Sequence, residues 1–235
     1  MKKRIRRILT LLITLVLAAG CLMMPASAQE EEGKVATILF THDMHSHLLP
    51  AEQEGGGEYG GFARLMTALE QERAEAEASG YACITVDGGD FSMGTLFQTI
   101  YTTQATELRS LGALGYDVAT FGNHEYEYRA DGLAKMLRAA VESGDPLPAL
   151  VQANYVTPKD PEADAEVVEA MDDCGVTDYV MIERDGVRFA VFGVMGEDAD
   201  ACAPMSGMEF EPVIEAAQRV VDEIKANEEY DFLIC

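Results

Sequence analysis

The feature that most constrains the fold is a regular alternation of short apolar runs with amphipathic helical patterns. Four runs are rich in β-branched and aromatic residues and are bounded by polar or glycine-rich segments, which is typical of buried strands. These runs are Lys34–Thr41, Tyr81–Val86, Asp117–Phe121 and Ala149–Tyr155. Between them, apolar residues recur every three or four positions, which predicts helices. The helical patterns cover Phe62–Leu69, Leu108–Leu111 and Leu133–Val141. Repeated strand–helix units predict an α/β fold with a largely parallel sheet and helices on both faces.

The second half of the chain predicts a hairpin and one further strand–helix–strand passage. Asp185-Gly186 separates two apolar runs, Tyr179–Glu183 and Val187–Val194, and an Asp-Gly pair in that setting favours a tight β-turn. A helix is predicted from Glu211 and a last strand over Asp231–Cys235. Because that strand has no loop after it, we expect the sequence to be cut inside a domain.

The segment between these two halves is polar, and the cysteines near it leave two alternatives open. Pro158–Asp173 is rich in acidic residues and is predicted to be a solvated loop. Cys83 lies in an apolar run, which favours a buried thiol. Cys174 and Cys202 flank the hairpin, so they can either form a disulfide or remain free, because connectivity does not follow from sequence.

The N-terminus has the pattern of a targeting segment. The basic cluster Lys2–Arg7 leads into the apolar run Ile8–Ala19, and Ala26-Ser27-Ala28 follows. These parts predict a secretory signal peptide over residues 1–28, and therefore an exported protein. The apolar run is short for a bilayer span, so no transmembrane span is expected in the mature chain. The alternative is a lipoprotein anchored at Cys21, which ends a lipoprotein-like box.

Charge narrows the classes of partner. The 235 residues carry 17 basic and 41 acidic side chains, a net charge of −24. Such an acidic surface repels polyanions, so no nucleic-acid polymer is expected as a partner. No heptad pattern or other signal indicates an oligomeric state.

Polar side chains follow three of the predicted strands at the point where each strand ends. His42-Asp43-Met44-His45 follows the first strand, Asp87-Gly88-Gly89-Asp90 the second, and Gly122-Asn123-His124-Glu125 the third. Sites in sheets of this class form beyond the carboxyl ends of the strands, so these side chains are expected to converge. In an extended segment Asp43 and His45 point the same way and can grip one ion. The glycines before Asp90 and Asn123 are expected to let the backbone approach the ions closely.

The types of side chain at these positions indicate the class of cofactor. Mixed carboxylate, imidazole and amide ligation suits Mn, Zn, Fe or Mg rather than a thiolate site. Two such ions about 3.5–4 Å apart can clamp a phosphoryl group and activate a water molecule.

The order and content of the three motifs carry a family resemblance. Ile38–His47 (ILFTHDMHSH), Asp87–Thr95 (DGGDFSMGT) and Val118–Glu125 (VATFGNHE) resemble the calcineurin-like metallophosphoesterase superfamily. They are similar in particular to its secreted 5'-nucleotidase / 2',3'-cyclic phosphodiesterase / UDP-sugar hydrolase branch. The resemblance implies a β-sandwich of mainly parallel βα units with flanking helices, here truncated before its last strands. Residues 29–235 would then be the N-terminal part of a catalytic domain.

The resemblance also implies residue roles. Asp43 and His45 would bind the first of two divalent ions, Asp90 would bridge the two, and Asn123 would bind the second. His124 would face the phosphate as a catalytic residue. Glu127 stands where the family usually has an aspartate that orients this histidine, and a solvated carboxylate is the alternative interpretation. We assign no role to His42, His47 or Asp87.

Two features of the family are missing from this sequence. The family takes its remaining metal ligands from later histidine motifs, whereas His42, His45, His47 and His124 are the only histidines here. The family's C-terminal nucleotide-binding domain is also missing. We therefore expect this chain alone to be inactive, as the N-terminal fragment of a longer enzyme.

The expected activity of that enzyme is hydrolysis of phosphate esters, with nucleotide 5'-monophosphates or related nucleotides as small-molecule substrates. The alternatives are another oxyanion-ester hydrolase on the same scaffold, or a non-catalytic phosphatase-like surface module.

Overall fold

The first sheet contains the predicted parallel strands. The computed structural model describes residues 33–235, and Val35–Cys235 forms one compact unit. The predicted signal peptide and Cys21 therefore lie outside the described residues. The strands are all parallel in the order β1-β4-β5-β6. Their bounds are β1 Ala36–Thr41, β4 Ala82–Asp87, β5 Val118–Ala119 and β6 Ala149–Leu150.

The second sheet contains the predicted hairpin. Its order is β11-β9-β8, with β8 at Tyr179–Arg184, β9 at Val187–Phe192 and β11 at Phe232–Ile234. Strands β8 and β9 are antiparallel, and the turn residues Asp185 and Gly186 both have positive φ, 51° and 75°. Strand β11 then lies parallel to β9 after the crossover helix α9, Val213–Asn227.

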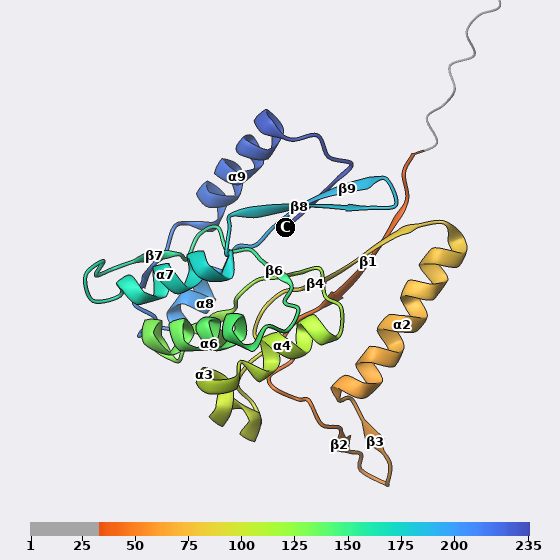
Figure 1. The fold of residues 1–235 in the computed structure, drawn as a ribbon, viewed down its shortest axis with the longest axis horizontal. Coiled ribbons are helices and arrows are strands. Elements are labelled where there is room, and N and C mark those ends of the chain that lie inside the picture. The colour runs from red at the N-terminus through yellow and green to blue at the C-terminus, as the bar shows by residue number, and fades with distance from the viewer. Residues whose placement is uncertain (1–32) are drawn as a thin grey trace, which may run out of the picture. The chain divides into compact units, whose positions relative to one another are not determined.

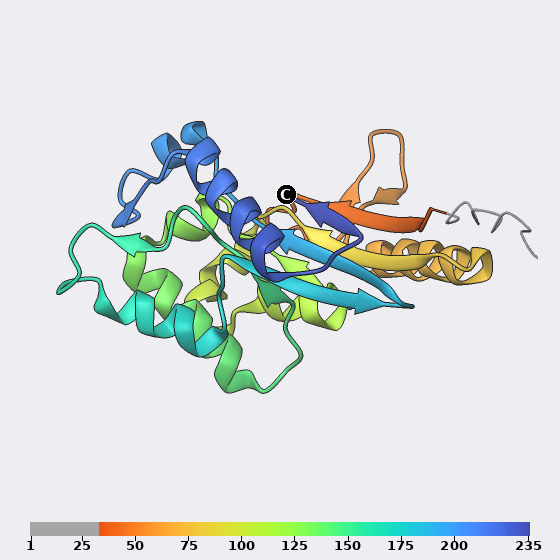
Figure 2. The ribbon, with the colours of Figure 1, turned by 90° about the horizontal axis from the view of Figure 1, so that it is seen from above.

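The two sheets pack against each other as a sandwich. Alternate residues of β4, including Ile84 and Val86, form a buried cluster with Val118 of β5 and with Val187 and Phe189 of β9. Figure 2 shows the two layers seen from the side. The predicted fold class, an α/β β-sandwich with mainly parallel strand–helix units, is confirmed.

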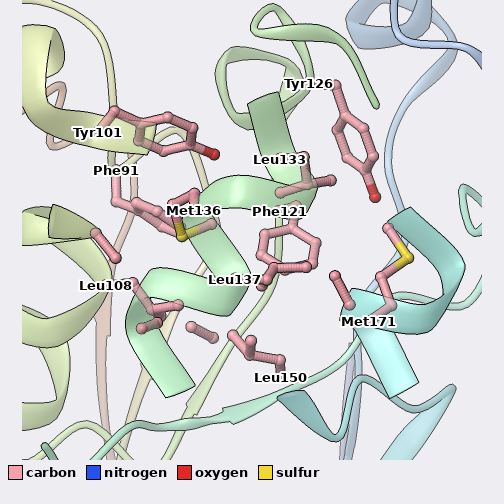
Figure 3. Close-up of a cluster of buried hydrophobic side chains, with 14 of the residues drawn as sticks. Phe91, Tyr101, Leu108, Phe121, Tyr126, Leu133, Met136, Leu137, Leu150 and Met171 are labelled. Atoms are coloured by element: carbon pink, nitrogen blue, oxygen red, sulfur yellow. The ribbon is translucent and has the colours of Figure 1, made fainter. Parts of the chain in front are cut away.

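Helices cover the outer faces of both sheets. On the first sheet they form the largest core, around Leu108, Leu133 and Leu137 (Figure 3). On the second sheet α9 lies beside β8 and β9 (Figure 1), and its residues Val220 and Ile224 pack against Ala190 and Phe192. The helices of the first group are α2 Phe62–Ser79, α3 Tyr101–Gln104, α4 Thr106–Ala113, α5 Asn123–Tyr126, α6 Arg129–Ser143 and α7 Ala165–Cys174.

Short elements complete the described part of the chain. They are the 3-10 turn η1 Leu96–Ile100, helix α8 Glu197–Cys202, and the paired short strands β2 Ala51–Glu52 with β3 Glu58–Tyr59 and β7 Thr157–Pro158 with β10 Met208–Glu209. No helix within residues 33–235 is long and apolar enough to cross a membrane.

The prediction of a solvated loop over Pro158–Asp173 is wrong in its second half. Helix α7 forms there and buries Val167, Ala170 and Met171 against the core that contains α6. These three residues have the i, i+3, i+4 spacing of one helix face, whereas the acidic residues of α7 are exposed to solvent. The cysteines of residues 33–235 are all free, so the open alternative of a Cys174–Cys202 bridge does not form in this structure.

Candidate functional site

The loops after β1, β4 and β5 are joined to one another by hydrogen bonds at one edge of the first sheet. The amide of Asp43 donates to the carbonyl of Gly89 (3.0 Å), and the amide of His45 donates to the carbonyl of Asp90 (3.0 Å). The amide of His124 donates to the Oδ1 atom of Asp90 (2.9 Å). The three polar motifs of the sequence therefore meet in space.

The loop after β1 places Asp43 and His45 side by side, but the backbone geometry differs from the prediction. The segment is not extended: Asp43, His45 and Ser46 have φ values of 54°, 46° and 54°. This left-handed turn still brings the Nε2 atom of His45 to 3.8 Å from the Oδ1 atom of Asp43. The pair is adjacent because the chain coils, not because side chains alternate along a strand.

The second ring nitrogen of His45 determines which atom is free to bind. Nδ1 lies 3.0 Å from the carbonyl oxygen of Met93. A carbonyl oxygen can only accept, so this contact assigns the proton to Nδ1 and leaves the Nε2 lone pair of the neutral ring facing Asp43. Metal-binding histidines in proteins are usually oriented by such a contact from the other ring nitrogen.

Asp90 lies at the centre of the three loops. Burial raises the pKa of Asp90, and the nearby carboxylate of Asp43 acts in the same direction, against the lowering effect of His124. A carboxyl group whose ionisation is disfavoured by burial and by a neighbouring carboxylate forms a site at which a divalent cation lowers the energy.

Helix α5 carries Asn123 and His124, and Glu127 ends it. The Nδ2 atom of Asn123 donates to Oε1 of Glu127 (3.2 Å). The Nδ1 atom of His124 lies 3.3 Å from Oε2 of Glu127 but has no hydrogen-bond partner within the described residues. The rings of His124 and His45 meet edge to face with centroids 4.8 Å apart. Glu127 therefore contacts both Asn123 and His124.

Glu125 is a residue of the site that sequence reasoning missed. Its side chain is fully buried and accepts from the amides of Asp90 (2.9 Å), Gly122 (2.8 Å) and Ser92 (2.9 Å) and from the Ser92 hydroxyl (2.7 Å). Burial raises the pKa of Glu125 to about 8, against the opposing effect of these donors. The signal in the sequence was the position of Glu125 directly after Asn123 and His124. No role was assigned to Glu125 itself from the sequence.

The glycines of the site also allow a close approach between two loops. A Cβ atom on Gly122 would lie 2.2 Å from Oδ1 of Asp90, and one on Gly89, where φ is 93°, would lie 2.4 Å from the amide nitrogen of Gly122. These glycines let two loops approach each other, since no side chain fits between them.

The three residues without an assigned role make structural contacts. Asp87 accepts from the hydroxyl of Thr41 (2.6 Å) and the amide of Gly89 (3.0 Å), and burial raises its pKa to about 6. His47 contacts the carbonyl of His45 through Nδ1 (2.8 Å), and the same atom of His42 contacts Asp43 (2.8 Å).

The donors present fit divalent ions by chemistry and charge, but they do not enclose one. Asp43, His45, Asp90 and Asn123 supply oxygen atoms and an imidazole nitrogen, as Mn, Zn, Fe or Mg sites require. Within residues 33–235, however, no group of three or more His, Cys, Asp and Glu side chains is arranged around a single ion position.

Comparison with curated proteins finds similarity to 5'-nucleotidases and to a nucleotide phosphoesterase. No family model matches the chain. The trifunctional nucleotide phosphoesterase YfkN of Bacillus subtilis is 28% identical over 215 residues, which are 84% of this chain and 14% of YfkN. The 5'-nucleotidase of Vibrio cholerae is 28% identical over 220 residues, covering 92% of this chain and 36% of that enzyme. For human 5'-nucleotidase the identity is 28% over 228 residues, covering 90% and 34%.

Solved structures share the fold. The 5'-nucleotidase precursor of Thermus thermophilus superposes with a TM-score of 0.66 at 23% identity and covers 85% of this chain and 36% of its own. YfkN, described in its structure as a calcineurin-like phosphoesterase, gives 0.62 at 18% identity, covering 84% and 60%. The chain thus spans about a third of the length of the 5'-nucleotidases it matches.

Proposed function

Because this chain belongs to the calcineurin-like phosphoesterase superfamily and to its 5'-nucleotidase branch, we propose that the protein hydrolyses phosphate esters of nucleotides, above all nucleoside 5'-monophosphates. Relatives that act on nucleotides, according to their names, support this substrate class. The proposal concerns the whole protein, because the chain spans about a third of the length of those 5'-nucleotidases.

The observation that carries the proposal is the meeting of the three motifs at one sheet edge. Asp90 accepts the amide hydrogen of His124, while the His124 ring touches the ring of His45. Three loops that follow three different strands thus bring two carboxylates, two imidazoles and one amide into one cluster. A purely structural cluster has no need of a His45 Nε2 lone pair that faces Asp43, or of a His124 Nδ1 atom without a hydrogen-bond partner within residues 33–235.

Two divalent ions, of Mn, Zn, Fe or Mg, complete the proposed site. Asp43 and His45 would hold the first, Asn123 the second, and Asp90 would contact both. The ions supply a water nucleophile of lowered pKa and neutralise charge on the phosphoryl oxygens.

The chain's own residues are proposed to act on the phosphoryl group as follows. His124 faces the substrate and stabilises charge or donates a proton to the departing oxygen. Glu127 accepts a hydrogen bond from Asn123 with one carboxylate oxygen and lies near Nδ1 of His124 with the other, and in this place it positions the imidazole. Asp90, tied to the backbone of α5, keeps the three loops in register.

We also propose that the protein is exported, with residues 1–28 as its signal peptide. Lipid attachment at Cys21 is the alternative. Residues 29–235 are then the N-terminal part of the catalytic domain. Mass spectrometry of the N-terminus after expression in a secreting host distinguishes cleavage after Ala28 from a lipidated Cys21.

The experiment that tests the function is a substrate screen of the full-length protein. Phosphate release is measured from 5'-AMP, 2',3'-cyclic AMP, a UDP-sugar, polyphosphate and p-nitrophenyl phosphate, with Mn²⁺ or Zn²⁺ or with EDTA. The proposal expects metal-dependent release, highest from 5'-AMP, and its loss in Asp90→Asn but not in the exposed control Asp222→Asn. A protein inert toward every ester with every ion contradicts the proposal, and release from polyphosphate alone moves it to another branch.

A further inference from the structure

Within the described part of the chain, a buried carboxyl group outside the proposed active site makes a single hydrogen bond. Glu107, in the first turn of α4, is 0% exposed and precedes Leu108, a residue of the largest core. Its Oε1 atom accepts the hydroxyl hydrogen of Ser46 (2.6 Å). Its Oε2 atom is buried with no hydrogen-bond partner within residues 33–235. Burying a carboxyl group with one oxygen unpaired costs free energy. The part of the chain that the Glu107–Ser46 hydrogen bond holds in place can explain why the group is buried.

Ser46 is the residue directly after His45. It is fully buried, and its backbone is held at both ends: its amide donates to the carbonyl of Phe91 (2.8 Å), and its carbonyl accepts from the hydroxyl of Thr95 (2.7 Å). The Glu107 contact is the one that uses the side chain of Ser46. Ser46 therefore attaches the loop after β1 both to the loop after β4 and to helix α4.

This attachment acts on a strained segment. Asp43, His45 and Ser46 all have positive φ, between 46° and 54°, a conformation that is costly for residues other than glycine. Such a turn persists when surrounding contacts over-determine it. The side chain of Ser46 is short and buried, so its hydrogen bond to Glu107 fixes the backbone of the turn at the residue next to His45.

We propose that Glu107 is a positioning residue of the metal centre: by accepting the Ser46 hydroxyl hydrogen, it holds the left-handed turn that presents Asp43 and His45 to an ion. This inference rests on the proposed function, because it assumes that the pair binds metal. Glu107 itself is not a ligand, since its side chain faces Ser46 from the helical layer.

The test uses the purified full-length protein freed of metal. Ser46→Ala removes the hydroxyl with little change in volume, and Ser110→Ala is the matched control, because Ser110 is in the same helix as Glu107 and its hydroxyl bonds the carbonyl of Thr106 (2.6 Å). The two readouts are the Kd for Mn²⁺ from titration calorimetry and the hydrogen-exchange rates of the His45 and Ser46 amides without metal. We expect Ser46→Ala to weaken Mn²⁺ binding about tenfold and to speed exchange, because contacts that orient metal ligands contribute on that scale. Ser110→Ala is expected to match the wild type.

A second variant checks that Ser46 acts through Glu107. Glu107→Gln keeps an acceptor oxygen for Ser46, so its affinity should fall between those of the wild type and Ser46→Ala. The double variant should bind no more weakly than Ser46→Ala alone, because the two residues share one contact. If Glu107→Gln does not fold, Ser46→Ala with its control decides alone. Wild-type affinity in Ser46→Ala, or additive losses in the double variant, would overturn this inference only. A wild-type protein that binds neither Mn²⁺ nor Zn²⁺ would refute the proposed function, and this inference with it.

Discussion

The Nδ1 atom of His124 is buried 3.3 Å from the Oε2 atom of Glu127, yet no hydrogen bond joins them. Asn123 already donates to the other carboxylate oxygen of Glu127. Asn123 thus holds the Glu127 carboxylate beside the imidazole of His124, and the second carboxylate oxygen remains available to that imidazole. This relationship supports an orienting role for Glu127 over a merely solvated carboxylate, and the role is open to a direct test.

Glu127→Gln tests whether the negative charge beside His124 is used in turnover. The amide keeps the size of the side chain and its contact with Asn123 but loses the charge that stabilises a protonated imidazole. We expect kcat for 5'-AMP to fall about tenfold or more with KM little changed, since proton transfer contributes at least that much. Steady-state kinetics measures both, and Glu142→Gln, an exposed helix residue, is the control. Equal kinetics in all three proteins would show that Glu127 is a surface carboxylate only.

Glu125→Gln tests the contribution of the buried carboxylate to stability. Both oxygens of Glu125 accept hydrogen bonds, and one of them serves the amides of Asp90 and Gly122. An amide group must turn its NH₂ toward one set of these donors and leave them unpaired. At about pH 9, above the raised pKa of Glu125, where its side chain is a carboxylate, we expect the free energy of unfolding to fall by about 2–4 kcal/mol. Urea denaturation followed by circular dichroism measures it, with Glu142→Gln as a reference, and an unchanged midpoint contradicts the prediction.

The raised pKa of Asp87 predicts a specific pH dependence of the free energy of unfolding. Burial raises the pKa of Asp87 to about 6 in the folded protein, above its ordinary value of 3.8. At this group the folded state therefore binds more protons than the unfolded state between about pH 4 and pH 6, so the contribution of Asp87 to the free energy of unfolding decreases as pH rises through this window and is constant above it. This rise in pKa corresponds to about 3 kcal/mol.

The Asp87→Asn variant isolates this contribution. Its amide does not titrate, so the difference in unfolding free energy between wild type and variant should change between about pH 4 and pH 6 and be constant at higher pH. Urea titrations in EDTA at each pH measure the difference. Parallel curves across the whole range would mean that Asp87 has an ordinary pKa.

The cysteines predict a pattern of chemical labelling. Cys174 is partly buried, and burial raises its pKa to about 11, whereas Cys202 is exposed. Because the thiolate is the reactive form, iodoacetamide should label Cys202 well before Cys174 at about pH 8. Peptide mass spectrometry of the native protein over time gives both rates. Failure of both to react until a reductant is added would instead indicate a disulfide between them.

Several features of the fold and site were predictable because they depend on local patterns. The spacing of Leu133, Met136 and Leu137 predicts one helix face, and the Asp185-Gly186 pair predicts its hairpin. The meeting of Asp43, Asp90 and Asn123 followed from parallel strands whose carboxyl ends share one edge. Helix α7 was missed because its acidic residues outweigh a three-residue apolar face that acquires meaning only beside α6.

The sequence by itself determined the order of strands and helices and the identity of the polar residues after each strand, because period and composition act over a few neighbouring positions. Only the tertiary structure decided how those residues are held. The contacts that hold the left-handed turn at Asp43 and His45, three of the four donors on Glu125 and the contact between Glu107 and Ser46 all depend on segments far apart in the chain. Hydrogen bonds of this kind leave no periodic pattern, since each depends on where two separately folded loops meet.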